Sequence, residues 1–173
     1  MQYHEISPDE LGFDRIRRIM REGLKLSLSD RSVELVRKCR EYLDNKLEKT
    51  QEPLYGINTG FGSLYDCLIS KEDLGILQKN LVLSHACGQG DEIPQEITRL
   101  MLFLKVQSLA YGNSGIQADT IRRMVDFFNE GITPVVYSYG SLGASGDLAP
   151  LAHLSLPLIG EGEVYHKEKK KSA

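Results

Sequence analysis

The sequence has few cysteines and no hydrophobic run long enough to cross a membrane. Its three cysteines, Cys39, Cys67 and Cys87, are scattered and odd in number, with neither CxxC spacing nor a histidine cluster nearby. This pattern gives neither a disulfide framework nor a zinc site, so we expect reduced thiols and no bound metal. The most apolar late stretch, residues 148–159, is too short for a span and is interrupted by two prolines. We therefore expect no contact with a membrane.

A strong net charge is also missing. The formal net charge is -3 and charged residues make up 26% of the chain, which gives no reason to expect nucleic acid as a partner. Residues 1–5 lack the basic start and apolar core of a signal peptide, so we expect a cytoplasmic protein. The length of 173 residues suits a single domain, 1–173, able to bury a sizeable core. Small-molecule or protein partners fit this composition best.

The hydrophobic periodicity predicts a mainly α-helical fold with a few short strands. The first helix is expected to start at Ser7-Pro8-Asp9-Glu10 and to end near Arg21. A longer helix should follow Ser29-Asp30 and end near Thr50. Later helices are expected after residues 70–73, from residue 94 and over 117–129, and strands at 3–6, 25–28 and within the tail after 163. The helix from residue 94 is apolar nearly all round, which places it in the centre of a bundle.

Two glycine-rich stretches interrupt the helical pattern. Tyr55–Gly62 has three glycines in eight residues, which predicts an irregular loop. The second stretch contains Gly143-Ala144-Ser145-Gly146-Asp147. It does not match the G-x-S-x-G elbow of hydrolases, because its second glycine comes one residue early, and no Lys-Ser or Lys-Thr follows as a phosphate loop requires. A plain turn or a weak anion-binding loop remains open on the spacing alone.

A backbone cyclisation uses all three central residues of the second stretch. If the amide nitrogen of Gly146 attacks the carbonyl carbon of Ala144, a five-membered imidazolone closes with loss of water. Elimination of the Ser145 hydroxyl then leaves an exocyclic methylidene, and the product is an electrophile made from the backbone. Gly146 permits close backbone approach because it has no Cβ, and Ala144 is small. Asp147 could assist the proton transfers, with Gly143 supporting the loop.

Several motifs in this chain resemble those of the aromatic amino acid ammonia-lyases and aminomutases, which carry a methylidene-imidazolone group. The matching stretches cover nearly the whole chain in the family's order: Tyr55–Gly62, Leu77–Ala86, Gly112–Ile116, Gly140–His153 and Gly160–Glu163. The resemblance implies a prosthetic group formed from Ala144-Ser145-Gly146, with no diffusible cofactor and no metal. It also implies that Tyr55 is the base that removes the substrate's β-proton. A phenol is ordinarily protonated at neutral pH, so this role needs a site that stabilises phenolate.

The resemblance implies that the pair Ser84-His85 recognises the side chain of the substrate. The chain is most similar to the histidine-acting members, which have Ser-His at this place, whereas tyrosine-acting members tend to have His-Leu and phenylalanine-acting members Phe-Leu. The implied reaction is elimination of ammonia from L-histidine to give trans-urocanate. A lyase or aminomutase acting on tyrosine or phenylalanine is the first alternative. His153 is interpreted as scaffold beside the prosthetic loop.

The length departs from the family pattern. Family members are much longer, and the resemblance implies that the long C-terminal helices of the homotetramer core, and later residues that bind the substrate carboxylate, are not in this chain. We expect an N-terminal portion of a lyase that is incomplete or inactive by itself. The second alternative, from a different class, is a non-catalytic helical module that serves in interaction or oligomerisation.

Overall fold

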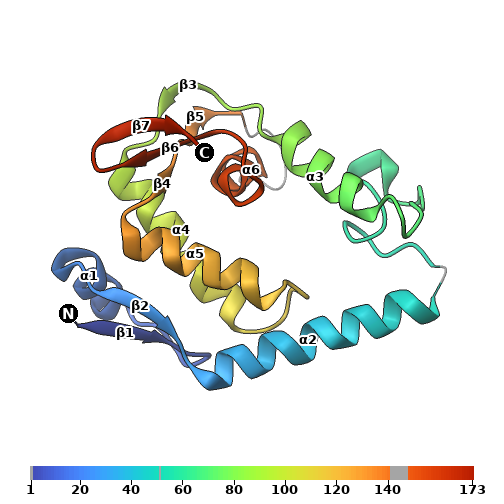
Figure 1. Ribbon diagram of the computed structural model, residues 1–173, viewed down its shortest axis with the longest axis horizontal. Coiled ribbons are helices and arrows are strands. Elements are labelled where there is room, and N and C mark those ends of the chain that lie inside the picture. The colour runs from blue at the N-terminus through green and yellow to red at the C-terminus, as the bar shows by residue number, and fades with distance from the viewer. Residues whose placement is uncertain (1, 51, 141–147) are drawn as a thin grey trace. The chain divides into compact units, whose positions relative to one another are not determined.

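The computed structural model describes residues 2–50, 52–140 and 148–173 (Figure 1). These residues form two compact units. The first holds residues up to 48, 94–133 and 165–171, and the second holds 49–93, 134–164 and the last two residues. Each unit is therefore assembled from segments that are not contiguous in sequence. The prediction of one domain over 1–173 stays a prediction.

In the first unit, strand β1 (Tyr3–Ile6) pairs in parallel with strand β2 (Lys25–Leu28), and helix α1 (Phe13–Glu22) connects them. Gly23 ends the helix in the left-handed conformation at φ 63°, as its position in the sequence indicated. The expected helix start at Ser7 is wrong. The Ser7 hydroxyl instead accepts the Asp9 N–H at 3.3 Å and donates to the Asp9 carboxylate at 3.0 Å, which closes a local turn.

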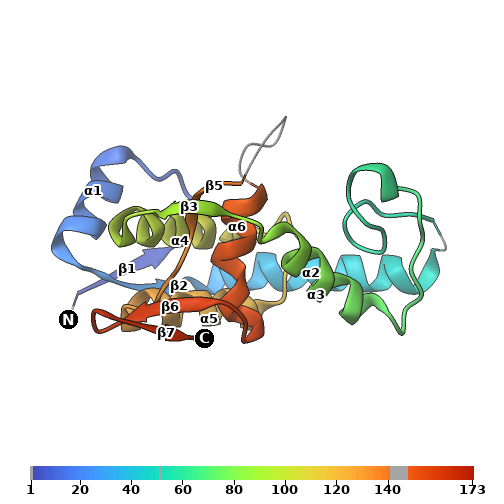
Figure 2. The same ribbon diagram turned by 90° about the horizontal axis from the view of Figure 1, so that it is seen from above.

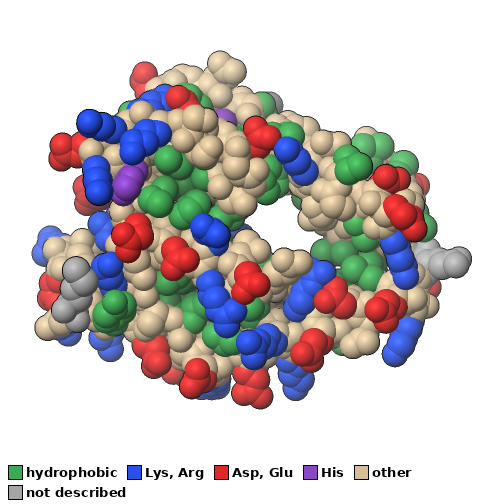
Figure 3. Space-filling model, viewed as in Figure 1, with side chains coloured by type: hydrophobic (Ala, Val, Ile, Leu, Met, Phe, Trp, Pro, Cys, Tyr) green, Lys and Arg blue, Asp and Glu red, His purple; other side chains and the backbone are tan. Residues whose placement is uncertain are grey.

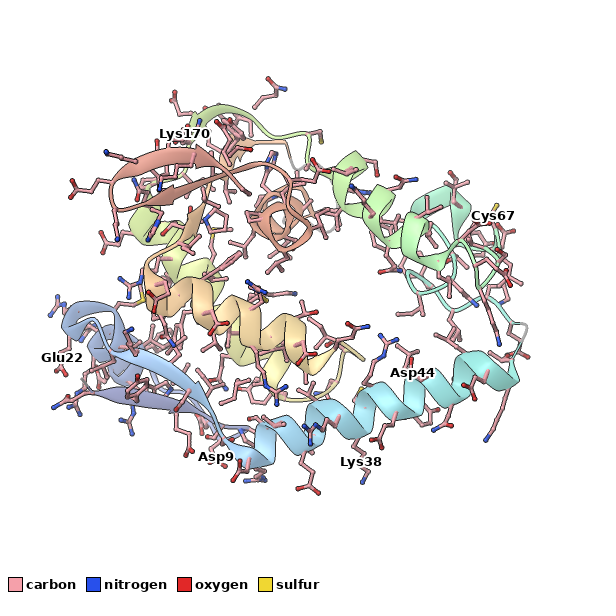
Figure 4. All side chains as sticks on the ribbon, in the orientation of Figure 1. Asp9, Glu22, Lys38, Asp44, Cys67 and Lys170 are labelled. Carbon is pink, nitrogen blue, oxygen red and sulfur yellow. The ribbon has the colours of Figure 1, made fainter. Side chains whose placement is uncertain are left out.

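Helix α2 (Asp30–Lys49) begins where the sequence placed it. The Ser29 hydroxyl accepts the backbone N–H of Ser32 at 3.1 Å and so caps the first turn. Basic and acidic side chains are interspersed along the helix surface in Figure 3. Lys38 and Asp44, labelled in Figure 4, project from it, and Arg40 forms a two-bond ion pair with Asp44 one turn on. The helix is thus mostly a solvated element with a narrow buried side.

The core of the first unit lies between helices α4 (Gln95–Ala110) and α5 (Ala118–Glu130), which run side by side in both ribbon views (Figures 1 and 2). Phe103 of α4 and Phe128 of α5 are fully buried, with ring centroids 6.0 Å apart. Burying rings of this size is a main source of stability in a unit this small. The helix after residue 94 buries one side, including Leu102, Phe103 and Val106, but Ile97 and Leu104 are exposed, so the prediction that it is buried nearly all round holds only in part. Gly131 ends α5 at φ 68°.

The second unit combines an irregular loop, a short 3-10 turn η1 (Gly62–Leu64) and helix α3 (Leu74–His85). Strand β3 (Gln89–Glu92) pairs antiparallel with β5 (Tyr137–Tyr139). Helix α6 (Leu148–Ser155) packs beside α3 and continues into a second 3-10 turn, η2 (Leu156–Ile159). A three-stranded sheet, whose residues are divided between the two units, has the order β4 (Thr133–Pro134), β6 (Glu163–His166) and β7 (Lys169–Ser172). The lysine-rich tail is therefore a strand.

The fold is mainly α-helical with a few short strands, as the periodicity predicted. In the ranges that the structure describes, no helix combines the length and the apolar character needed to cross a membrane.

Candidate active site

Tyr55 lies on a loop that side-chain hydrogen bonds hold in shape. The Asn58 carboxamide accepts the N–H of Leu54 at 2.6 Å and donates to the carbonyl of Glu52 at 3.1 Å. Thr59, fully buried, accepts the N–H of Gly56 at 3.2 Å. These bonds replace the ladder that a helix or strand would provide, which is why Asn and Thr occur inside a glycine-rich stretch. The loop is therefore an ordered platform for its tyrosine.

The side chain of Tyr55 is 63% exposed, and its ring contacts Phe61 with centroids 5.7 Å apart. The backbone N–H of Gly62 points to the phenol oxygen at 3.4 Å. Gly56 makes the ring contact possible: it adopts φ 68°, and a Cβ there would come within 2.7 Å of the Phe61 ring. The loop backbone thus supplies a hydrogen-bond donor to the oxygen that would act as the base.

His85 lies at the last position of α3, and its hydrogen bonds define its tautomer. The Nδ1 atom is 2.7 Å from the carbonyl oxygen of Leu81, one turn earlier. A carbonyl can only accept, so Nδ1 carries the proton, and Nε2 of the neutral ring is left as an acceptor. Ser84 donates to the same carbonyl at 3.2 Å, with its hydroxyl 3.1 Å from Nδ1. Ser84 thus helps to hold the imidazole.

Phe61 connects the two predicted site residues. Its ring centroid is 5.1 Å from that of His85, in an edge-to-face arrangement, and 5.7 Å from that of Tyr55. The structure therefore brings Tyr55 and His85 into one aromatic cluster, which we call the Tyr55–Phe61–His85 cluster. The sequence motifs by themselves did not point to Phe61. Its place between two glycines of the loop was the available signal, since small neighbours make room for a ring.

The predicted prosthetic triplet Ala144-Ser145-Gly146 and its predicted supports, Gly143 and Asp147, lie outside the described residues. The triplet's residue types fit the cyclisation, since they supply the nucleophilic amide, the carbonyl and the hydroxyl that leaves. Gly140, at φ 142°, approaches Gly88 so closely that a Cβ would lie 2.8 Å from the Gly88 Cα.

His153 of α6 is buried next to Gly88. Its Nε2 accepts the backbone N–H of Gly88 at 2.9 Å, and its ring meets Tyr137 edge-to-face at 5.2 Å. Because Nε2 accepts, the proton of the neutral ring is on Nδ1. Burial lowers the pKa of His153 below its ordinary value, which keeps the ring neutral. This arrangement supports the interpretation of His153 as scaffold.

Across residues 2–50, 52–140 and 148–173, no three His, Cys, Asp or Glu side chains are grouped as ligands for a metal ion. Cys39, Cys67 and Cys87 are free thiols, and Figure 4 shows Cys67 on the segment between η1 and α3.

Comparison with known proteins gives the class of this chain. The family model described as aromatic amino acid lyase matches residues 11–173, and the chain belongs to that family. It is 44% identical over 168 residues to a histidine ammonia-lyase of Legionella pneumophila, covering 97% of this chain and 33% of the relative.

Solved structures agree on the fold. A histidine ammonia-lyase from Trypanosoma cruzi has a TM-score of 0.84 at 32% identity, covering 99% of this chain and 33% of the other. An ergothionase from Treponema denticola has a TM-score of 0.92 at 27% identity, covering 98% of this chain and 34% of the other. The chain therefore spans about a third of the length of the relatives it matches.

Proposed function

We propose that this chain is the N-terminal portion of a histidine ammonia-lyase, which eliminates ammonia from L-histidine to give trans-urocanate. The observation that carries the proposal is the Tyr55–Phe61–His85 cluster, which holds a candidate base and a candidate substrate-recognition residue in one unit. The 44% identity to a histidine ammonia-lyase over 97% of the chain supports the same substrate.

His85 favours an imidazole substrate on chemical grounds. With Nδ1 committed to the Leu81 carbonyl, Nε2 is free to accept a hydrogen bond from the N–H of a substrate imidazole. Phenylalanine has no group to fill that acceptor, and sites built around a hydrogen bond discriminate strongly against analogues that lack it. A tyrosine hydroxyl could also donate to Nε2, so tyrosine is the more serious competitor.

Tyr55 is proposed to remove the β-proton of the bound substrate. This proton is barely acidic, so the reaction needs both a base and an activated leaving group. The Gly62 N–H, 3.4 Å from the phenol oxygen, would help to hold that oxygen in place for the proton transfer. The methylidene-imidazolone formed from Ala144-Ser145-Gly146 would supply the electrophile that makes the substrate's amino group a leaving group.

Assembly and location belong to the same proposal. A homotetramer in the cytoplasm, with the remaining site residues supplied by parts of the lyase beyond this chain, fits the one-third coverage of the relatives. No diffusible cofactor and no metal ion are proposed.

Two measurements test the proposal. Intact mass spectrometry of the 173-residue chain is expected to show a mass lower by two waters, and the unmodified mass would refute the claim that this chain makes its own electrophile. Urocanate absorbs strongly in the ultraviolet, so histidine turnover can be followed directly. We define the completed enzyme as this chain supplied with the remaining two thirds of the Legionella relative, and we expect it to form urocanate while the chain alone does not.

The same assay separates the alternatives. A completed enzyme that carries the modified mass but acts on tyrosine or phenylalanine would make this a lyase or aminomutase of different specificity. A chain without the modification and without activity in either form would instead be a non-catalytic helical module.

A further inference from the structure

The loop that carries Tyr55 is attached to the helix that carries His85 by a residue with no assigned role. Gln78, on α3, donates from its Nε2 atom to the carbonyls of Gly56, at 3.3 Å, and Ile57, at 3.0 Å. A carboxamide nitrogen has two hydrogens, so one group can make both bonds. The opposite orientation would place an oxygen against two carbonyl oxygens, so the assignment of the nitrogen is chemically required.

Gln78 and His85 occupy the same face of α3. They are seven residues apart, which is about two helical turns and about 10 Å along the axis. The loop therefore meets α3 at two places: through Gln78 at one, and through the Phe61 ring on His85 at the other. One attachment would allow the loop to pivot, whereas two fix its orientation.

The loop can transmit this attachment to Tyr55 because it is internally braced. Asn58 and Thr59 tie Leu54 and Gly56 to the loop interior, and the Asn58 carbonyl accepts the N–H of Ile69 at 2.9 Å. Gly56, whose carbonyl Gln78 holds, directly follows Tyr55 in the chain. A displacement of the Gly56 carbonyl would therefore displace the phenol as well.

We propose that Gln78 is a positioning residue that holds the Tyr55 loop on α3 and so sets the placement of the base relative to His85. The catalytic part of this inference rests on the proposed function, while the attachment itself does not. Gln78 touches no reacting atom. Its effect is on the geometry of Tyr55, and misplacing a catalytic group by about 1 Å can cost as much as about 100-fold in rate.

The test compares two variants of Gln78 that keep good helix formers at the position. Gln78→Met preserves the length of the side chain but removes the N–H donors, and Gln78→Lys retains donors that can reach the loop. Amide hydrogen exchange of the 173-residue chain is followed by mass spectrometry in peptides from residues 54–62. Peptides from α4, in the first unit, serve as the internal reference.

Exchange over 54–62 is expected to accelerate at least about 10-fold in Gln78→Met, with α4 unchanged, and to return near the parent rate in Gln78→Lys. Unchanged exchange over 54–62 in Gln78→Met would overturn the proposal. Acceleration that includes α4 would overturn it too, because Gln78 would then contribute to general stability.

Kinetics of the completed enzyme test the catalytic part. We expect kcat for histidine to fall about 10-fold in Gln78→Met, with KM changed by less than about 2-fold, and to recover in Gln78→Lys. Parent-like kcat in Gln78→Met alongside a loosened loop would overturn the positioning role. Absence of histidine turnover in the parent completed enzyme would count against the proposed function, and hydrogen exchange would still decide the attachment.

Discussion

The backbone N–H of Gly88 donates to Nε2 of His153 at 2.9 Å, across 65 positions of sequence. This bond joins the segment that follows His85 to helix α6, which begins directly after the predicted prosthetic stretch. It requires a neutral imidazole, because a protonated ring has no acceptor nitrogen. The local structure around the flanks of the triplet therefore depends on the protonation state of one buried histidine.

Acidification should destabilise the chain through His153. Burial lowers the pKa of this histidine in the folded state, so below about pH 6.5 the unfolded state binds more protons than the folded state. The contribution of neutral His153 to the free energy of unfolding is therefore present above about pH 6.5 and is lost as the pH falls below it. We expect the free energy of unfolding, measured with denaturant at pH 7.5 and 5.5, to fall less in His153→Gln than in the parent chain.

Glutamine is the matched replacement because its side-chain oxygen can accept the Gly88 N–H without titrating. His4 contributes to the pH dependence of both proteins, since burial and then Arg15 lower its pKa, so it cancels in the comparison. Identical pH dependence in the two proteins would show that His153 is not the group responsible.

Gly88 should not tolerate a side chain. A Cβ there would lie 2.8 Å from Nε2 of His153 and 3.0 Å from the Cβ of Tyr137. We expect Gly88→Ala to lower the free energy of unfolding by about 1–3 kcal/mol, the usual cost of overpacking. Gly75 is the control, because it lies within α3 and no atom of the described residues lies within 4 Å of its Cβ position. Gly75→Ala should stabilise by about 0.5–1 kcal/mol, and a loss of similar size in both variants would contradict the steric explanation.

Tyr55 should be required for turnover and not for folding. Because its side chain is 63% exposed, Tyr55→Phe is expected to change the free energy of unfolding by less than about 0.5 kcal/mol. Without the hydroxyl no proton can be taken, so kcat of the completed enzyme should fall by about 100-fold or more. The intact mass should still be lower by two waters.

Ser145→Ala is the complementary variant for the same experiment. It removes the only hydroxyl that the cyclisation eliminates, so the two-water loss and the activity should both disappear while the fold remains. Near-normal turnover in Ser145→Ala would refute the mechanism, and parent-like kinetics in Tyr55→Phe would remove Tyr55 from the role of base.

His85 should determine preference among aromatic amino acids. His85→Leu removes the acceptor nitrogen, and we expect the ratio of kcat/KM for histidine to that for phenylalanine to fall by about 10-fold to 100-fold. His85→Gln, which keeps a hydrogen-bonding group near the Nε2 position, should retain more of the preference. An unchanged ratio in His85→Leu, measured by competition in the completed enzyme, would show that other residues select the substrate.

Much of the fold could be predicted because its signals are local. Ser29 caps α2, and Gly23 and Gly131 end their helices with positive φ, since each depends on backbone groups a few residues away. Helix starts were harder to predict where the same side chain can either cap a helix or close a turn. Ser7 closes a turn with Asp9 in place of opening a helix, and α3 starts at Leu74, beyond the capping sequence of Ser70.

Some residues of the candidate site could likewise be predicted from local sequence, and others could not. The residue types of Ala144-Ser145-Gly146 define the possible cyclisation by themselves, because the three residues are consecutive and their atoms are the reactants. The motifs that contain Tyr55 and His85 also predicted both as site residues. Phe61 and Gln78 were not, since what distinguishes them is contact with residues of another segment.

The sequence alone thus determined the family and the helical class, and it predicted the precursor of an electrophile. Only the tertiary structure decided that Phe61 contacts both Tyr55 and His85, that His85 leaves Nε2 as its acceptor, and that Gln78 holds the loop. Propensities and caps act over a few residues, whereas these contacts depend on how distant segments pack, and that packing depends on burial summed over a whole unit.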